Sequence, residues 1–102
     1  MGDYLPAMGE SDLAEGSMAT VDIGGERILL SKIGGEVFAV AATCTHEEAD
    51  LGQGFILEDR VVCPLHLSQF DLRTGDAVNP PATAPLRRYR TRVDKGTVYV
   101  EV

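Results

Sequence analysis

The chain holds its cysteines and histidines in two short motifs. CTH at 44–46 and CPLH at 63–66 contain every cysteine and histidine of the 102 residues, and sixteen residues separate them. A spacing of two or three residues lets one loop point a thiolate and an imidazole toward a common centre, and both groups are metal ligands. A hairpin across the sixteen residues would bring the two loops together. The pattern therefore predicts a metal site formed by Cys44, His46, Cys63 and His66.

Two simpler interpretations need no metal. Cys44 and Cys63 could form a disulfide beside incidental surface histidines, or both could be buried thiols without a role. The chain is acidic and starts without the basic and apolar regions of a signal peptide, so we expect a cytoplasmic protein. Cytoplasmic thiols are kept reduced, which argues against the disulfide.

The distribution of the ligands between the motifs indicates which metal is bound. Zinc fingers usually draw both cysteines from one knuckle and both histidines from a helix. Here each motif supplies one cysteine and one histidine, which suits a binuclear cluster with both thiolates on one iron and both imidazoles on the other. We therefore expect a 2Fe-2S cluster, and a zinc-stabilised interaction module remains the alternative.

The elements that must position these motifs are short strands. Apolar residues alternate with polar ones, which is the period of half-buried strands, and Gly24-Gly25 and Gly34-Gly35 are typical of tight hairpin turns. The pattern predicts an all-β protein built on a small antiparallel β-barrel or sandwich, with little helix. The expected strands are 18–23, 27–33, 37–42, 55–58, 60–63, 70–72, 86–94 and 98–102.

Length and charge restrict the function further. A chain of 102 residues supports one hydrophobic core, so we expect a single domain. The net charge of −7 disfavours binding to nucleic acid, and no stretch is apolar enough to cross a membrane. Both histidines are already used as ligands, so no side chain is left for a catalytic dyad.

These motifs carry a family resemblance. CTH and CPLH, with FDLRTG at 70–75 and a proline loop at 80–85, resemble a Rieske 2Fe-2S ferredoxin, particularly the small ferredoxins of bacterial aromatic-ring-hydroxylating dioxygenases of the biphenyl and toluene type. The resemblance implies a basal β-domain at about 1–41 and 73–102 and a cluster-binding insertion at about 42–72. It also implies that Cys44 and Cys63 bind the inner iron and His46 and His66 the outer one.

The resemblance implies electron transfer and no catalysis by the chain itself. Such ferredoxins carry one electron at a time from an NADH-dependent flavoprotein reductase to a terminal Rieske oxygenase, and we expect a monomer because the carrier exchanges partners. An alternative in the same family is the small subunit of an assimilatory nitrite reductase.

Residues beside the ligands suggest how the cluster is tuned and how partners dock. Ser68 stands where high-potential Rieske proteins donate a hydrogen bond to a bridging sulfide, whereas Phe70 replaces a tyrosine that donates to a cysteine sulfur. The acidic residues Glu47, Glu48 and Asp50 favour a low potential, about −150 mV. Candidate docking residues are Leu65, Leu67, Glu47 and Glu48, and we expect one of the two leucines to be packed and the other exposed.

Overall fold

The computed structural model describes residues 2–45, 49–64, 67–79 and 84–102. The regular secondary structure of this part of the chain is almost wholly antiparallel strand, so the all-β prediction is confirmed. The strands are β1 (Tyr4–Gly9), β2 (Met18–Ile23), β3 (Glu26–Ile33), β4 (Glu36–Ala41), β5 (Phe55–Leu57), β6 (Arg60–Val62), β7 (Gln69–Asp71), β8 (Arg88–Tyr89), β9 (Thr91–Asp94) and β10 (Thr97–Glu101). Its helical elements are two 3-10 turns, η1 (Glu10–Asp12) and η2 (Leu51–Gln53), and neither is long enough to cross a membrane.

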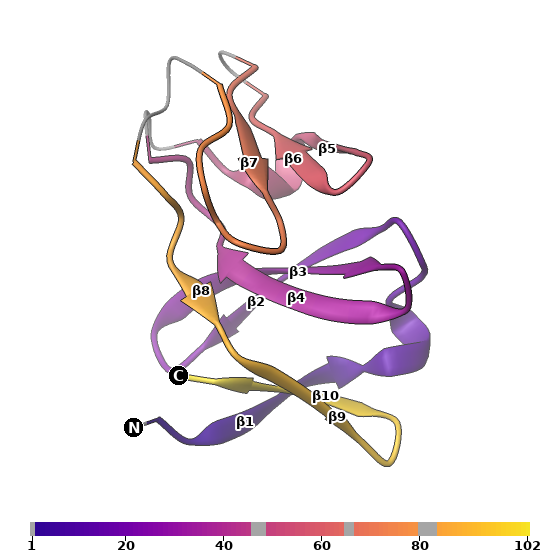
Figure 1. Ribbon diagram of the computed structural model, residues 1–102. Helices are drawn as coiled ribbons and strands as arrows, with labels where there is room; N and C mark the ends of the chain where they lie inside the picture. The colour runs from indigo at the N-terminus through magenta and orange to yellow at the C-terminus, as the bar shows by residue number, and fades with distance from the viewer. Residues whose placement is uncertain (1, 46–48, 65–66, 80–83) are drawn as a thin grey trace.

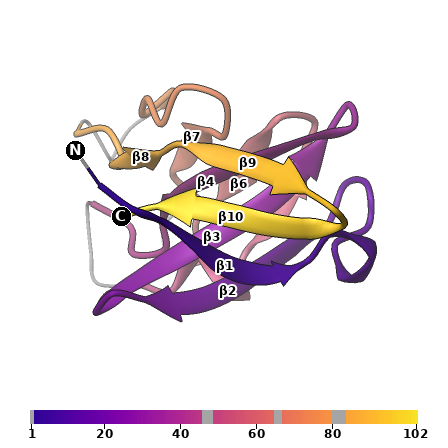
Figure 2. The ribbon, with the colours of Figure 1, turned by 90° about the horizontal axis from the view of Figure 1, so that it is seen from below.

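The strands form three antiparallel sheets, ordered β1-β10-β9, β2-β3-β4-β8 and β5-β6-β7. β1 contacts β2 and β4 contacts β9, so the first two sheets close into a small barrel. Figure 2 shows the barrel from below, with β9, β10 and β1 side by side in front of β2, β3 and β4. The third sheet forms a separate upper lobe above β4 (Figure 1).

β3 and β4 are buried on both faces, because a hydrophobic core lies on each side of them. Ile28 and Leu30 point into the barrel, where Leu30 pairs with Ala39. Leu29 pairs with Val40 and points the other way, toward the upper lobe. Side chains alternate in direction along a strand, so burial on both sides produces the continuous apolar run of this segment.

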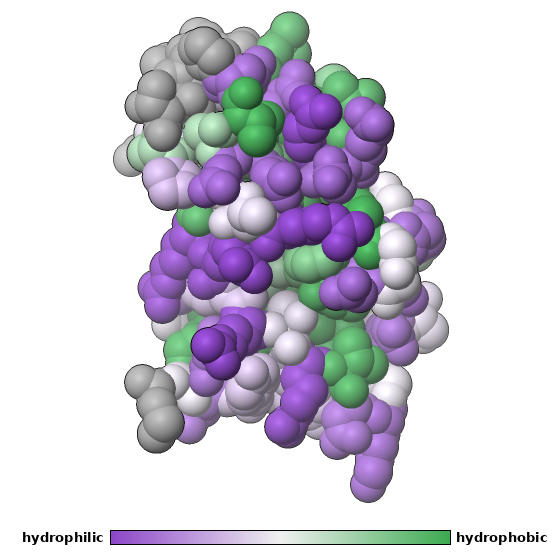
Figure 3. Space-filling view, viewed as in Figure 1, coloured by the Kyte–Doolittle hydropathy of each residue, from purple (hydrophilic) through white to green (hydrophobic). Residues whose placement is uncertain are grey.

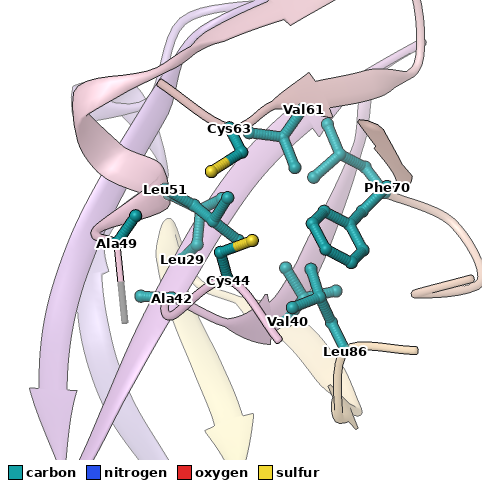
Figure 4. Close-up of a cluster of buried hydrophobic side chains, with 11 residues drawn as sticks. Leu29, Val40, Ala42, Cys44, Ala49, Leu51, Val61, Cys63, Phe70 and Leu86 are labelled. Atoms are coloured by element: carbon teal, nitrogen blue, oxygen red, sulfur yellow. The ribbon is translucent and has the colours of Figure 1, made fainter. Parts of the chain in front are cut away.

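The core of the upper lobe contains both cysteines. Figure 4 shows this cluster of buried side chains, which rests on Leu29 and Val40 of the barrel. Its other members are Ala42, Cys44, Ala49, Leu51, Val61, Cys63, Phe70, Leu72 and Leu86. The same packing therefore ties the upper lobe to the barrel and surrounds the thiols with apolar groups.

Two parts of the strand pattern differ from the prediction. β1 was not predicted, because Pro6 and a register shift between Pro6 and Met8 break its alternation. Proline is tolerated there because β1 is an edge strand, paired only with β10. The single strand predicted over 86–94 is two strands, because the chain leaves β4 after Tyr89 and joins β10 at Thr91.

The turn between β3 and β4 is held by a distant carboxylate. Gly34 and Gly35 have φ angles of 61° and 80°, which side chains with a Cβ rarely adopt. Their N–H groups donate to the two oxygens of Glu15 at 2.6 and 2.9 Å. The hydrogen bonds from Gly35 and Gly34 lower the pKa of Glu15. Glu15 thus fastens the segment before β2 to this hairpin.

Ser31 on β3 is buried with an unused hydroxyl. Its side chain is fully buried, and its Oγ has no hydrogen-bond partner among the described residues. Because burying an unpaired hydroxyl costs free energy, we expect Ser31→Ala to raise the free energy of unfolding by about 1 kcal/mol. Thermal unfolding monitored by circular dichroism measures the change.

Ser17 provides the matched control. Its Oγ donates to the carbonyl of Ala14 at 2.6 Å, so Ser17→Ala removes a hydrogen bond that is made. This variant should be no more stable than the parent chain. A lower melting temperature for Ser31→Ala than for the parent would contradict the prediction.

Candidate metal centre

Two closed loops carry the cysteines, and their closure follows one pattern. Loop 1 follows β4, and the N–H of Cys44 donates to the carbonyl of Ala49 at 2.9 Å. Loop 2 joins β6 to β7, and the N–H of Cys63 donates to the carbonyl of Ser68 at 2.7 Å. In each loop the cysteine bonds to the residue five positions later. Each cysteine is therefore fixed at the base of a short loop, next to the sheet.

The two thiols lie in one buried space. Cys44 and Cys63 are 4% and 1% exposed, and no disulfide joins them. Figure 4 shows both side chains beside Leu29 and Leu51 in the same hydrophobic cluster, with Phe70 on the other side of Cys44. Because the two thiols are not joined, the structure does not support the disulfide interpretation.

The other predicted site residues fall into two groups. Ser68 is fully buried at the end of loop 2, and Leu67 is 60% exposed with a φ of 58°. Five candidates lie outside the described residues: His46, Glu47, Glu48, Leu65 and His66. In the sequence these five fall between Cys44 and Ala49 or between Cys63 and Leu67, within the two closed loops.

A third segment is attached to both loops. The Oγ1 of Thr45 in loop 1 donates to the carbonyl of Ala84 at 2.7 Å. At the other end of this segment, the Oδ1 of Asn79 accepts the N–H of Gln69, and its Nδ2 donates to the carbonyl of Leu67 at 3.5 Å. Thr45 and Asn79 were not predicted as site residues. The sequence features that could have identified them are the hydroxyl inside the CTH motif and the amide directly before the prolines.

The charge of Asp50 is offset within the structure. One carboxylate oxygen lies 3.1 Å from the guanidinium of Arg27, and the other accepts the N–H of Gly52 at 2.9 Å. Asp50 therefore caps η2 and forms an ion pair. Asp50 therefore lowers the reduction potential of a metal centre in the loops less than an unpaired carboxylate would.

The residues present fit an iron-sulfur group. Thiolates are the soft ligands that iron-sulfur clusters take, and the apolar side chains around Cys44 and Cys63 exclude water. The described residues contain no cluster of three or more cysteine, histidine or acidic side chains, and both histidines lie outside them. Cys44 and Cys63 lie in the same buried cluster, and the four-residue ligand set stays a prediction.

Comparison with known proteins defines the class. The model of the Rieske [2Fe-2S] domain matches residues 3–90, so the chain belongs to this family. The cofactor of the family is a Rieske 2Fe-2S cluster, which agrees with the buried pair of thiols.

Individual relatives within this family are ferredoxin components of dioxygenase systems. The chain is 40% identical over 91 residues to the ferredoxin component of biphenyl 2,3-dioxygenase from Rhodococcus jostii RHA1, covering 89% of this chain and 85% of that protein. It is 29% identical over 99 residues to the ferredoxin component of the naphthalene 1,2-dioxygenase system of Pseudomonas putida, covering 97% and 95%. The ferredoxin of carbazole 1,9a-dioxygenase from Nocardioides aromaticivorans IC177 superposes with a TM-score of 0.91 at 29% identity, covering 95% of both chains.

Thr45 allows a test of the third segment. Thr45→Val removes the hydrogen bond to Ala84, which is worth about 1 kcal/mol. The rate at which an iron chelator removes the cluster should therefore rise about fivefold. Thr45→Ser keeps the hydroxyl and should restore the parent rate. Bleaching of the visible absorbance measures both rates, and equal rates for valine and serine would contradict a role for the bond.

Proposed function

We propose that this protein is a one-electron carrier, the ferredoxin component of a dioxygenase system that acts on an aromatic compound. The observation that carries the proposal is the similarity to ferredoxin components. The chain is 40% identical to that of biphenyl 2,3-dioxygenase and 29% identical to that of the naphthalene 1,2-dioxygenase system, and it covers 85% and 95% of these proteins.

We further propose that Cys44 and Cys63 bind one iron and that His46 and His66 bind the other. When bound, the cluster accepts and releases one electron. The chain contributes two closed loops that hold the thiols at fixed positions and a core that keeps water from them. The cluster-binding unit would span about 42–72, within a basal domain of 1–41 and 73–102.

The proposed partners are a flavoprotein reductase as donor and a terminal Rieske oxygenase as acceptor. A structure of the carbazole 1,9a-dioxygenase system contains oxidised ferredoxin in complex with reduced oxygenase. Our chain superposes on one chain of that complex with a TM-score of 0.91 at 31% identity. We propose that the protein is a monomer, because a carrier that alternates between two partners must leave each of them. We also propose that it acts in the cytoplasm.

The reduction potential should lie at the low end of the Rieske range, about −150 mV. Phe70 is buried beside the cysteines without a hydroxyl, so it cannot donate a hydrogen bond to a sulfur. Glu47 and Glu48 add negative charge next to a proposed ligand, while Asp50 is paired with Arg27 and adds less. A redox titration followed by visible circular dichroism measures the potential, and a value above about +100 mV would contradict this assignment.

The function itself is tested with the purified, iron-loaded protein. We expect two irons and two sulfides per chain, reduction by NADH through a ferredoxin reductase, and transfer of the electron to a terminal oxygenase such as that of biphenyl 2,3-dioxygenase. Colourless protein containing one zinc would instead support the zinc module.

A second candidate is the small subunit of a nitrite reductase. A protein assigned to that class superposes with a TM-score of 0.82 at 27% identity, below the values for the ferredoxins. Electron transfer to a nitrite reductase, without transfer to any aromatic-ring oxygenase, would favour this candidate.

A further inference from the structure

The upper-lobe sheet has an outer face that no other described strand covers. Cross-strand partners point to the same side of a sheet. Ile56, Val61 and Phe70 form one row, and this row points into the core. The neighbouring row, Phe55, Val62 and Gln69, therefore points to the opposite side of the sheet, where Phe55 is 52% exposed and Val62, in the middle of the row, is only 2% exposed.

The segment after β7 extends this outer row. Phe70 forms an isolated bridge with Ala77, and the N–H of Val78 donates to the carbonyl of Gln69 at 2.9 Å. Val78 thus lies beside Gln69 and continues the row. Leu57 lies two residues after Phe55 on β5 and points to the same outer side.

Exposed apolar side chains are concentrated on this lobe. Among the described residues, six large apolar side chains are exposed, and four of them are Phe55 at 52%, Leu57 at 45%, Leu67 at 60% and Val78 at 44%. The other two, Leu5 and Val93, lie on β1 and β9 of the barrel. Figure 3 shows apolar side chains reaching the surface of the upper lobe, whereas hydrophilic ones cross the middle of the molecule.

The row lies at the end of the sheet that carries the metal centre. Val62 directly precedes Cys63, and Gln69 directly follows Ser68, so loop 2 leaves and returns at this row. Leu67 belongs to that loop and is tied to Asn79 by a hydrogen bond. Leu67 and Val78 therefore lie beside the loop that holds a proposed ligand of the cluster, whereas Phe55 and Leu57 lie on β5, at the other edge of the sheet.

We propose that Phe55, Leu57, Leu67 and Val78, here called the outer apolar face, form the docking surface for the terminal oxygenase. This inference rests on the proposed function. An electron carrier must place its metal centre against the acceptor, and a docking surface that borders loop 2 does so. Exposed apolar groups gathered in one place mark interaction sites.

The surroundings of the face suit a transient complex. Arg60 of β6 donates to Gln69 of β7 at 2.9 Å on the same side of the sheet, so a polar pair lies between the apolar residues of β5 and Val78. Interfaces combine such polar groups with a few apolar anchors. Four anchors are few for a permanent dimer, whose interfaces are larger and more apolar. A protein partner that binds briefly therefore fits better than a second copy of the chain.

Val78 and Val93 provide a matched pair for the test. They are the same residue type with nearly equal exposure, 44% and 41%, but Val93 lies on β9 in the barrel. Iron-loaded Val78→Thr, Val93→Thr and Phe55→Ser proteins are compared with the parent in electron transfer to the terminal oxygenases of biphenyl, naphthalene and carbazole dioxygenases. Visible spectra and reduction potentials, expected to match the parent, verify that the cluster is intact.

We expect Phe55→Ser to raise the ferredoxin concentration that gives half the maximal rate about 10-fold, and Val78→Thr about threefold, with the limiting rate and the Val93→Thr protein unchanged. If the parent transfers electrons but all variants behave alike, the docking surface is overturned and the proposed function stands. If the parent reduces none of the oxygenases, the proposed function fails and the docking surface fails with it.

Two further results would assign the face to another occupant and overturn the proposal. One is slower reduction of the variants by the reductase with unchanged transfer to the oxygenase. The other is a dimer of the parent chain in sedimentation experiments that Phe55→Ser dissociates.

Discussion

Gly54→Ala is expected to prevent assembly of the cluster while most of the β-structure is kept. A Cβ at this position would lie 1.9 Å from the carbonyl oxygen of Val62, a backbone atom that cannot turn away. The strand β6 would have to move at Val62, and Cys63 is the next residue. The expected result is loss of most iron and visible absorbance, with far-ultraviolet circular dichroism close to that of the parent chain.

The control for this prediction is Gly96→Ala. Gly96 has a φ of 79° in the turn between β9 and β10, and a Cβ there would meet no atom within 4 Å. The substitution should cost only the strain of the left-handed backbone, about 1 kcal/mol, and should leave the iron content unchanged. Full iron content in Gly54→Ala would show that the end of β6 does not determine the position of Cys63.

Cys44→Ala and Cys63→Ala are each expected to abolish the cluster. The chain contains no third cysteine that could replace a lost ligand. Both side chains are buried in the upper-lobe core, and alanine removes one sulfur with little other change in packing. Iron and sulfide analysis, together with the visible and electron paramagnetic resonance spectra, should show at most background values.

His46→Ala and His66→Ala extend this test to the other pair of proposed ligands. If both histidine variants keep the spectrum of the parent chain while the cysteine variants lose it, iron is bound by the thiols and the proposed histidine ligands are wrong. Ser68→Ala serves as the control, because a hydrogen-bond donor is expected to change the potential and not the iron content.

Local sequence signals predicted most of the fold. β2 matches its predicted range, and the paired glycines mark the turns on both sides of β3. The pairing of β1 with β10 joins opposite ends of the chain, and no local pattern reports such a contact. The crossing from β4 to β10 at Arg90 was missed for the same reason, since residues 86–94 alternate as one strand would.

The spacing of two motifs predicts a candidate site, which stays a prediction, but it does not predict the way in which the loops are held. Cys44 and Cys63 are both buried in the core of the upper lobe. The bond from Thr45 to Ala84 joins residues 39 positions apart, and that from Asn79 to Leu67 joins residues 12 apart. Such tertiary hydrogen bonds depend on the folded arrangement of three segments, which the composition of each segment does not reveal.

The burial of β3 and β4 on both faces limits how this protein can be rebuilt. Because Leu29 and Val40 form the base of the upper lobe, deleting the lobe would leave an apolar surface on the barrel, and the barrel alone is not a self-sufficient scaffold. A lobe transplanted from a relative would need an underside that fits these two side chains. The two units are therefore exchangeable only as a matched pair, although the chain passes between them through short connections.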